Sequence, residues 1–185
     1  MRVGLFGGQF DPPHLGHLAV VRAARDQLGL DLVLVVPAAA PPHRPASDRD
    51  PLTRLRLTRA AFSGEPRVEV SGIELERGGP SYTVDTLTGL AGEDELFLIL
   101  GADQYAALDG WHESRRVREL ASIVVAPRPG FAIGDDAIEL RMEPVDLSSS
   151  ELRERLARGE PARGGVPEAV AGLIESERLY VQAPC

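Results

Sequence analysis

One segment near the N-terminus combines glycines and histidines at a spacing that suits phosphate binding. It reads Gly-Gly-Gln-Phe-Asp-Pro-Pro-His-Leu-Gly-His over residues 7–17, between an apolar run and a helix-like pattern. The glycines Gly7 and Gly8 allow backbone N–H groups to approach a ligand closely. A helix N-terminus presents unpaired N–H donors and a positive dipole end, which favours an anion. His14 and His17 are three residues apart, so we expect both on one face of the first turn, able to donate to phosphate oxygens.

Other interpretations of these histidines remain open from the residues alone. A capped helix start with two surface histidines is the simplest, because a short His-x-Gly-His match is common by chance. The spacing of His14 and His17 also permits two zinc ligands, but no third ligand is evident and no cysteine is near. We therefore assign no metal-binding residue. The chain has no Gly-x-Ser-x-Gly nucleophile elbow to support a serine hydrolase.

A second segment near the C-terminus has the composition of another phosphate-binding helix start. Ser148 followed three residues later by Glu151 is a capping box. The cap does not account for the hydroxyls of Ser149 and Ser150, or for Arg153 one turn inside. Backbone N–H groups, hydroxyls and a guanidinium together would grip phosphate. Two such helix starts suit a polyphosphate and a transfer reaction that depends on positioning and charge neutralisation.

The elements that must position these residues alternate between strand and helix. Apolar runs predict strands at residues 3–6, 32–36, 68–70, 73–75, 96–100, 122–126 and 138–142. Helical spacing predicts helices at 15–28, 51–62, 82–90, 151–158 and 167–177. This order predicts an α/β fold with a parallel sheet and helices on both faces.

Parallel sheets of this kind bind ligands at the carboxyl ends of their strands. Three unusual segments follow predicted strands: a Gly7-Gly8 turn, a proline-rich loop at residues 37–45, and Gly101-Ala102-Asp103. We expect these segments to meet at one edge of the sheet. The sequence thus predicts the location of a site.

Length and composition restrict the class of protein further. The 185 residues predict one domain over residues 1–185. A net charge of −8 gives no basic footprint, so we expect no nucleic-acid partner. All basic residues are arginine, and the absence of lysine excludes a Walker A loop and Schiff-base chemistry.

Cysteine use and hydropathy bear on location. The single cysteine, Cys185, cannot form an internal disulfide, which favours a reducing compartment. The apolar run at residues 3–6 is too short for a signal peptide or a membrane span. We therefore expect a cytoplasmic protein without a membrane partner.

For three further residues the sequence permits both a structural and a ligand-binding interpretation. Trp111 could fill the core, but its neighbours Gly110 and His112 favour a stacking platform. Asp103 could cap a following helix or face a ligand. Arg44, in the proline-rich loop, could be solvated or could clamp a phosphate.

At the level of these motifs the sequence resembles nucleotidyltransferases with a His-x-Gly-His signature, and within them the bacterial nicotinate-nucleotide adenylyltransferase family. The resemblance covers nearly the whole chain. It is carried by the segments 7–17, 41–44, 79–87, 101–103, 111–112, 128–130, 147–153, 166–167 and 179–180. The pair His-x-Gly-His and Ser-Ser-Ser-x-x-Arg is specific to the superfamily, and Pro-Ser-Tyr-Thr-Val-Asp-Thr-Leu with Gly-Ala-Asp and Trp-His narrows it to this family.

The resemblance implies a Rossmann-like fold of the nucleotidyltransferase type. It implies adenylyl transfer from ATP to nicotinate mononucleotide, giving deamido-NAD and pyrophosphate, with Mg²⁺ and with a homo-oligomer as a possible assembly. It implies three catalytic residues, which are His14, His17 and Arg153. The implied ATP-binding residues are Gly7, Gly8, His14, His17, Gly101, Asp103, Ser149, Ser150 and Arg153. The implied acceptor-binding residues are Arg44, Tyr82, Thr83, Trp111 and Arg128.

Two departures from the family pattern affect the acceptor side. Arg44 stands where the family usually carries lysine, and its planar guanidinium imposes different geometry. Residues 113–116 lack the second aromatic that commonly follows Trp-His.

The rival hypotheses are a sister enzyme that uses nicotinamide mononucleotide or phosphopantetheine, and a nucleotide-binding module without catalysis. The presence of both His17 and Arg153 counts against the last.

Overall fold

A six-stranded parallel sheet forms the centre of the computed structural model, which describes residues 1–41, 47, 49–92, 94–143, 145 and 147–181. The strand order is β3-β2-β1-β4-β5-β6. The strands are β1 (Arg2–Gly8), β2 (Leu32–Pro37), β3 (Val68–Val70), β4 (Glu95–Gly101), β5 (Ser122–Ala126) and β6 (Ile138–Glu139). The predicted fold class is confirmed. The interpretations placed on Arg44 and Cys185 lie outside the described residues.

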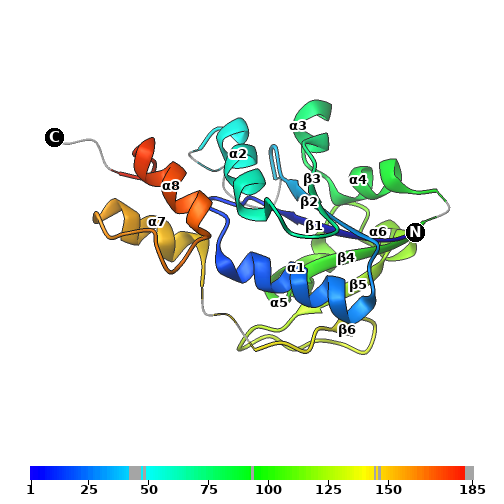
Figure 1. Cartoon of the computed structure of the whole chain (residues 1–185). Helices are drawn as coiled ribbons and strands as arrows, with labels where there is room; N and C mark the ends of the chain where they lie inside the picture. The colour runs from blue at the N-terminus through cyan, green and yellow to red at the C-terminus, as the bar shows by residue number, and fades with distance from the viewer. Residues whose placement is uncertain (42–46, 48, 93, 144, 146, 182–185) are drawn as a thin grey trace.

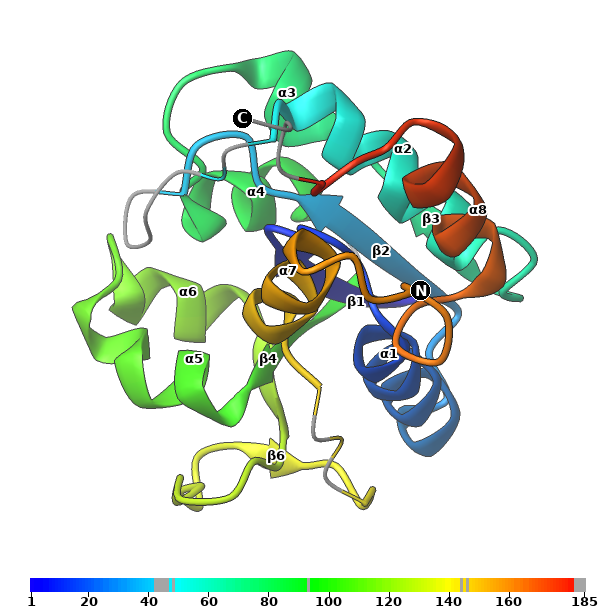
Figure 2. The same ribbon diagram turned by 90° about the vertical axis from the view of Figure 1, so that its left-hand side faces the viewer.

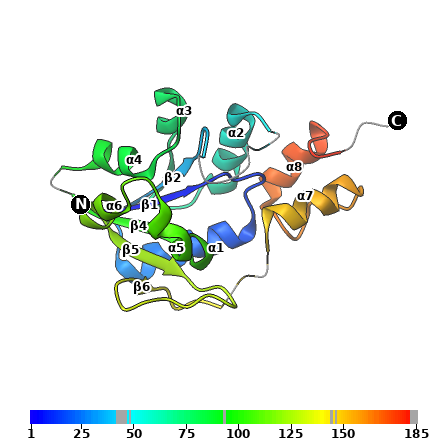
Figure 3. The ribbon, with the colours of Figure 1, turned by 180° about the vertical axis from the view of Figure 1, so that it is seen from behind.

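Helices cover both faces of this sheet (Figure 1). One core cluster joins the sheet to α1 (Leu15–Leu28), α2 (Pro51–Phe62), α7 (Ser149–Ala157) and α8 (Glu168–Ser176). The other joins it to α3 (Ile73–Arg77), α4 (Thr83–Leu90), α5 (Ala102–Ala107), the 3₁₀ turn η1 (Leu108–Gly110) and α6 (Ser114–Leu120). The view from behind shows α5 and α6 beside β5, with α7 and α8 beyond one end of the sheet (Figure 3).

The strand sequences explain why both faces are covered. Along β4, Leu96, Leu98 and Leu100 join the cluster under α4–α6, while Phe97 and Ile99 join the cluster under α1 and α2. Side chains alternate between faces in a strand, so an unbroken apolar run needs a hydrophobic layer on each side. This pattern fixes β4 as a central strand.

Two predicted strands differ from the structure. Residues 73–75 begin α3, because Gly72 forms its N-cap and Gly78, at φ 68°, ends it after five residues. A short apolar run does not distinguish a strand from a buried helical turn. The predicted strand at 138–142 is shortened to β6, although the backbone N–H of Leu140 still donates to Val125 O at 2.9 Å.

The glycine turn predicted after the first strand is also wrong. Gly7 and Gly8 are the last residues of β1 and pair with Val36 and Pro37 of β2. The chain turns after them, at Gln9–Pro13, and enters α1 at Leu15. The glycines therefore lie at the carboxyl end of a central strand.

Helix α7 lies in front of the carboxyl ends of the strands, as seen along the sheet from that end (Figure 2). The starts of α1 and α7 thus face the same edge of the sheet, as the sequence predicts. Within the described part of the chain, no helix is both long enough and apolar enough to cross a membrane.

Candidate active site

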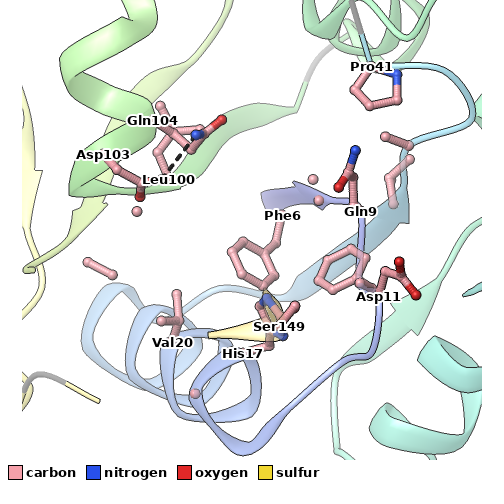
Figure 4. A pocket seen from close by; sticks show the side chains of 18 of the residues that line it. Phe6, Gln9, Asp11, His17, Val20, Pro41, Leu100, Asp103, Gln104 and Ser149 are labelled. Atoms are coloured by element: carbon pink, nitrogen blue, oxygen red, sulfur yellow. Dashed lines mark hydrogen bonds between the residues drawn. The ribbon is translucent and has the colours of Figure 1, made fainter. Parts of the chain in front are cut away.

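A cavity of about 580 Å³ opens at the carboxyl ends of β1, β2, β4 and β5 (Figure 4). This volume falls within the range of small-molecule binding sites. The lining includes every predicted site residue that the structure describes: Gly7, Gly8, His14, His17, Tyr82, Thr83, Gly101, Asp103, Trp111, Arg128, Ser149, Ser150 and Arg153. The predicted clustering at one edge of the sheet is therefore confirmed.

The ring of His17 is held in one orientation at the start of α1. Its Nδ1 accepts a hydrogen bond of 3.1 Å from the backbone N–H of His14. The Phe10 ring packs edge-on against it at 5.0 Å between centroids, and Phe6 lies at 6.0 Å (Figure 4). Because Nδ1 accepts, the proton of the neutral imidazole resides on Nε2. The ring therefore carries its donor on Nε2.

His14 is buried, and its ring stacks on the ring of His17. It is 7% exposed, and the two rings stack at 3.7 Å between centroids. Burial, reinforced by the positive charge of Arg128, lowers the pKa of His14 to about 4. Its Nδ1 has no partner within the described residues. His14 is thus a neutral imidazole near neutral pH and places no positive charge against His17.

The lowered pKa of His14 makes a testable contribution to acid sensitivity. The unfolded state binds a proton near pH 6.5, and the folded state binds it only near pH 4. Between these values the unfolded state holds more protons, so the stabilisation present above pH 6.5 is lost as pH falls. We expect a His14→Asn variant to lose about 3 kcal/mol less stability than the wild type between pH 7 and pH 4. Denaturant unfolding at both pH values measures this. Equal losses would contradict a neutral, buried His14.

Gly8 and Gly16 are required because the rings of Phe10 and His14 pack against the backbone at these positions. A Cβ on Gly8 would lie 3.1 Å from Cζ of Phe10, and one on Gly16 would lie 2.9 Å from Nδ1 of His14. At Gly7, by contrast, a Cβ would meet only the backbone oxygen of Val36, at 4.0 Å. Gly8 and Gly16 therefore let Phe10 and His14 approach the backbone, which adds a second reason for their small size.

The start of α7 is anchored to the turn that precedes α1. Ser148 caps the helix by accepting from Glu151 N at 3.2 Å, as predicted. Ser149 Oγ donates to Pro12 O at 3.0 Å, and Arg153 Nη1 donates to Asp11 O at 2.7 Å. These two side chains join the two helix starts, which the sequence alone did not predict. They hold α7 over the cavity, while the Arg153 side chain remains 38% exposed.

The other side of the cavity is aromatic. Tyr82 is the N-cap of α4, next to Thr83, and its ring lies 4.3 Å from that of His112. Trp111 is partly buried and packs against the cluster under α4–α6 while lining the cavity. The two readings of Trp111 are therefore compatible: one part of the ring packs and another faces the ligand space.

Asp103 and Arg128 form a weak pair across the cavity mouth. Arg128 Nη1 lies 3.7 Å from Asp103 Oδ1, and both side chains are partly exposed. The N-cap of α5 is Gly101, so Asp103 lies inside the first turn and is not the cap residue that one reading predicted. A ligand group can compete for either side chain, because exposed pairs are weak.

The lining residues that the sequence analysis did not assign include Phe10, Glu74 and Gln104. Phe10 adopts a left-handed backbone at φ 51° while its ring is 2% exposed. Glu74 is buried, with Oε1 accepting from Thr86 Oγ1 at 2.9 Å and Oε2 unpartnered within the described residues. Gln104 lines the cavity beside Asp103 (Figure 4). Glu74 and Gln104 carry no motif signal. Phe10 lies in the motif at residues 7–17, but its place beside His17 depends on tertiary packing.

A resident metal centre is not indicated by the residues that the structure describes. They contain no group of three or more His, Cys, Asp or Glu side chains placed to hold an ion. Among those described residues, the zinc interpretation of His14 and His17 gains no third ligand.

The parallel sheet, the two facing helix starts and the cavity between them define an α/β protein of the nucleotidyltransferase-like type. A family model described as "Cytidylyltransferase-like" matches residues 5–155. Curated relatives described as probable nicotinate-nucleotide adenylyltransferases include that of Thermus thermophilus, 45% identical over 97% of this chain and 100% of the relative. That of Roseiflexus castenholzii is 42% identical over 97% of this chain and 98% of the relative.

Solved structures match over the same extent. Plasmodium falciparum nicotinic acid mononucleotide adenylyltransferase complexed with APC superposes with a TM-score of 0.78 and 17% identity, covering 97% of this chain and 96% of that chain. The complex of that enzyme with NaAD gives a TM-score of 0.76. The chain belongs to the cytidylyltransferase-like family and, within it, to the nicotinate-nucleotide adenylyltransferases.

Proposed function

We propose that this protein transfers the adenylyl group of ATP to nicotinate mononucleotide, which yields deamido-NAD and pyrophosphate in NAD biosynthesis. The observation that carries the proposal is one continuous cavity, which joins two phosphate-suited helix starts to an aromatic acceptor side. The relatives described by the same activity, at 45% and 42% identity, support it.

The reaction depends on aligning the two substrates more than on covalent catalysis by a side chain. The phosphate oxygen of the mononucleotide attacks the α-phosphorus of ATP in line, a new P–O bond forms, and the bond to the β-phosphate oxygen breaks. His17 donates from Nε2 to a non-bridging α-phosphate oxygen as charge develops there. Ser149, Ser150 and Arg153 neutralise the leaving pyrophosphate at the start of α7.

The remaining ATP contacts follow from the same placement. Gly7 and Gly8 face the nucleotide from the end of β1, and Gly101 with Asp103 faces the adenosine side from the end of β4. Mg²⁺ would accompany ATP and would supply charge neutralisation there, since this ion commonly binds through substrate phosphates. No carboxylate cage is needed for that role.

The acceptor enters from the aromatic side. Tyr82, Thr83 and Trp111 meet the nicotinate ring, and Arg128 lies toward the phosphates. Backbone N–H groups near Thr83 and Trp111 receive the pyridine carboxylate. A site that pairs a carboxylate leaves donors unpaired against the neutral amide, which is a strong basis for discrimination.

Removing the Trp111 ring is expected to weaken acceptor binding selectively. Stacking of an aromatic ring on a base contributes about 1–3 kcal/mol, so Trp111→Ala should raise KM for nicotinate mononucleotide by about 10- to 100-fold. KM for ATP should change by less than about threefold, because the ATP side is untouched. Steady-state kinetics with each substrate varied in turn measures both. An equal rise in both constants would contradict a stacking role.

The proposed reaction is tested by identifying its product. Protein, ATP and Mg²⁺ are incubated with nicotinate mononucleotide or with phosphopantetheine, and the products are analysed by mass spectrometry. Deamido-NAD and pyrophosphate in equal amounts from the first acceptor, with no adduct from the second, is the expected result. An adduct only with phosphopantetheine would establish the sister enzyme. Bound ATP without product from either acceptor would favour the noncatalytic module.

A further inference from the structure

An arginine is buried beneath the cavity. Arg54, on α2, is 2% exposed and lies in helical register with the buried residues Leu57, Thr58 and Ala61. Arginine is almost never fully buried unless its donors are satisfied, because desolvating its charge is costly. Its place on the apolar face of α2 therefore needs a specific explanation.

The guanidinium of Arg54 binds carbonyl oxygens from two different loops. Nη1 donates to Gln9 O at 2.9 Å, in the turn that leads into His14. Nη2 donates to Ala39 O at 3.3 Å, and Nε donates to Arg49 O at 3.4 Å. Gln9 belongs to the ATP side, whereas Ala39 and Arg49 belong to the connection between β2 and α2. The rigid fork of donors joins the two loops at a fixed distance.

Hydrogen bonds also join the loop at Ala39 to the acceptor side of the cavity. The backbone N–H groups of Ala39 and Ala40 donate to Ser81 Oγ at 2.9 Å and 3.1 Å, and Ser81 N donates to Ala40 O at 3.0 Å. Ser81 directly precedes Tyr82 and Thr83 at the start of α4. A chain of hydrogen bonds thus runs from the acceptor side through Ser81, Ala39 and Arg54 to Gln9.

The turn that contains Gln9, on the ATP side, is also fixed by hydrogen bonds, which are made at Asp11. Asp11, two residues after Gln9, is 3% exposed, and its Oδ1 and Oδ2 accept from Tyr180 Oη and Ser47 Oγ, both at 2.6 Å. Its backbone oxygen accepts from Arg153. The negative charge of Asp11 also opposes the desolvation that lowers the pKa of Arg54. Gln9 therefore cannot shift without disturbing α7.

We propose that Arg54 is a positioning residue for adenylyl transfer: it fixes the ATP-side turn and the acceptor-side loop at the one spacing that brings the acceptor phosphate in line with the α-phosphorus. The inference rests on the proposed function. Arg54 touches neither substrate and acts through Gln9 and Ala39. A misplacement of about 1 Å between reacting groups lowers rate by about 100-fold, so this spacing affects kcat before it affects binding.

Arg25 provides a matched control. It is also a buried arginine, 7% exposed, on α1, and it donates to Asp26 and to Pro66 O at 3.1 Å. It does not line the cavity. Arg25→Lys thus reports what the loss of a buried guanidinium does to stability alone.

The experiment compares the wild type with Arg54→Lys and Arg25→Lys by Tm, Kd for ATP, and kcat for deamido-NAD formation. We expect Arg54→Lys to lower kcat by about 30- to 100-fold while Kd for ATP changes by less than about threefold. Arg25→Lys should lower Tm similarly and leave kcat within about twofold. Equal kcat losses in the two variants would overturn the proposal. No product from the wild type would instead overturn the proposed function.

A second variant keeps the test decisive if Arg54→Lys does not fold. Ser81→Ala removes only the hydroxyl that holds Ala39 and Ala40, and it is expected to lower kcat by about tenfold with an unchanged Kd for ATP. Where both variants fold, the double variant should lose less than the product of the single losses, because both act on one path. Wild-type kcat in Ser81→Ala, or full multiplicativity in the double variant, would contradict the path.

Discussion

The His17→Ala variant is expected to lower kcat by about two to three orders of magnitude. In the proposed reaction His17 donates from Nε2 to the α-phosphate, because its Nδ1 accepts from the backbone N–H of His14. Loss of one preorganised donor to a developing oxyanion costs about 10²–10³ in rate. The measurement is steady-state kcat with both substrates saturating, together with Kd for ATP.

A matched control lies on the same helix. Arg22 is exposed on α1 and pairs with Glu65, and it lies outside the cavity lining. Arg22→Ala should therefore retain kcat within about twofold. If folded His17→Ala turned over at near the wild-type rate, His17 would be removed from the mechanism.

The Arg153→Ala variant is expected to lower kcat/KM by about 10²–10³. Its guanidinium ties α7 to Asp11 O and lines the cavity, where we propose that it holds the leaving pyrophosphate. An arginine that stabilises charge in phosphoryl transfer contributes about 10³ or more in rate in known cases. Because part of the side chain's effect here is anchoring, Arg153→Lys should recover only a small part of the loss.

Arg155 is the control on the same helix. It pairs with Glu160 at 3.1 Å and is not among the residues that line the cavity. Arg155→Ala should leave kcat/KM within about twofold. A comparable loss in both variants would show that destabilising α7, and not removing a phosphate ligand, is responsible.

The long, periodic elements were predictable from sequence. Among the short ones, the strand at 68–70 was predicted correctly and the helix that begins at residue 73 was not. Helices 15–28 and 51–62 and strand 122–126 agree with the structure in both bounds, because apolar spacing and caps specify them. Residues 73–75 form a helix because glycines flank them, which a three-residue apolar run does not reveal. No helix was predicted over residues 102–120, where α5, η1 and α6 lie, because that segment has no strong helical periodicity of apolar residues.

The site residues that carry motifs were predictable, but those that support them were not. His14, His17 and Arg153 lie together as the two helix starts predicted. The edge-on packing of Phe10 against His17, and the anchoring of Arg153 to Asp11, depend on contacts between distant segments. Arg54 did leave a signal, since it occupies an apolar position of its helix, and a buried charge at such a position points to a polar network.

The central claim is adenylyl transfer to the nicotinate form of the acceptor, and pyrophosphate release tests it most directly. The wild-type protein is assayed with ATP and Mg²⁺, with nicotinate mononucleotide or nicotinamide mononucleotide at matched concentrations. We predict release at least about tenfold faster with the nicotinate form, because a carboxylate site leaves donors unpaired against the amide. Comparable rates would contradict the acceptor assignment, and release with neither acceptor from folded, ATP-binding protein would contradict the reaction itself.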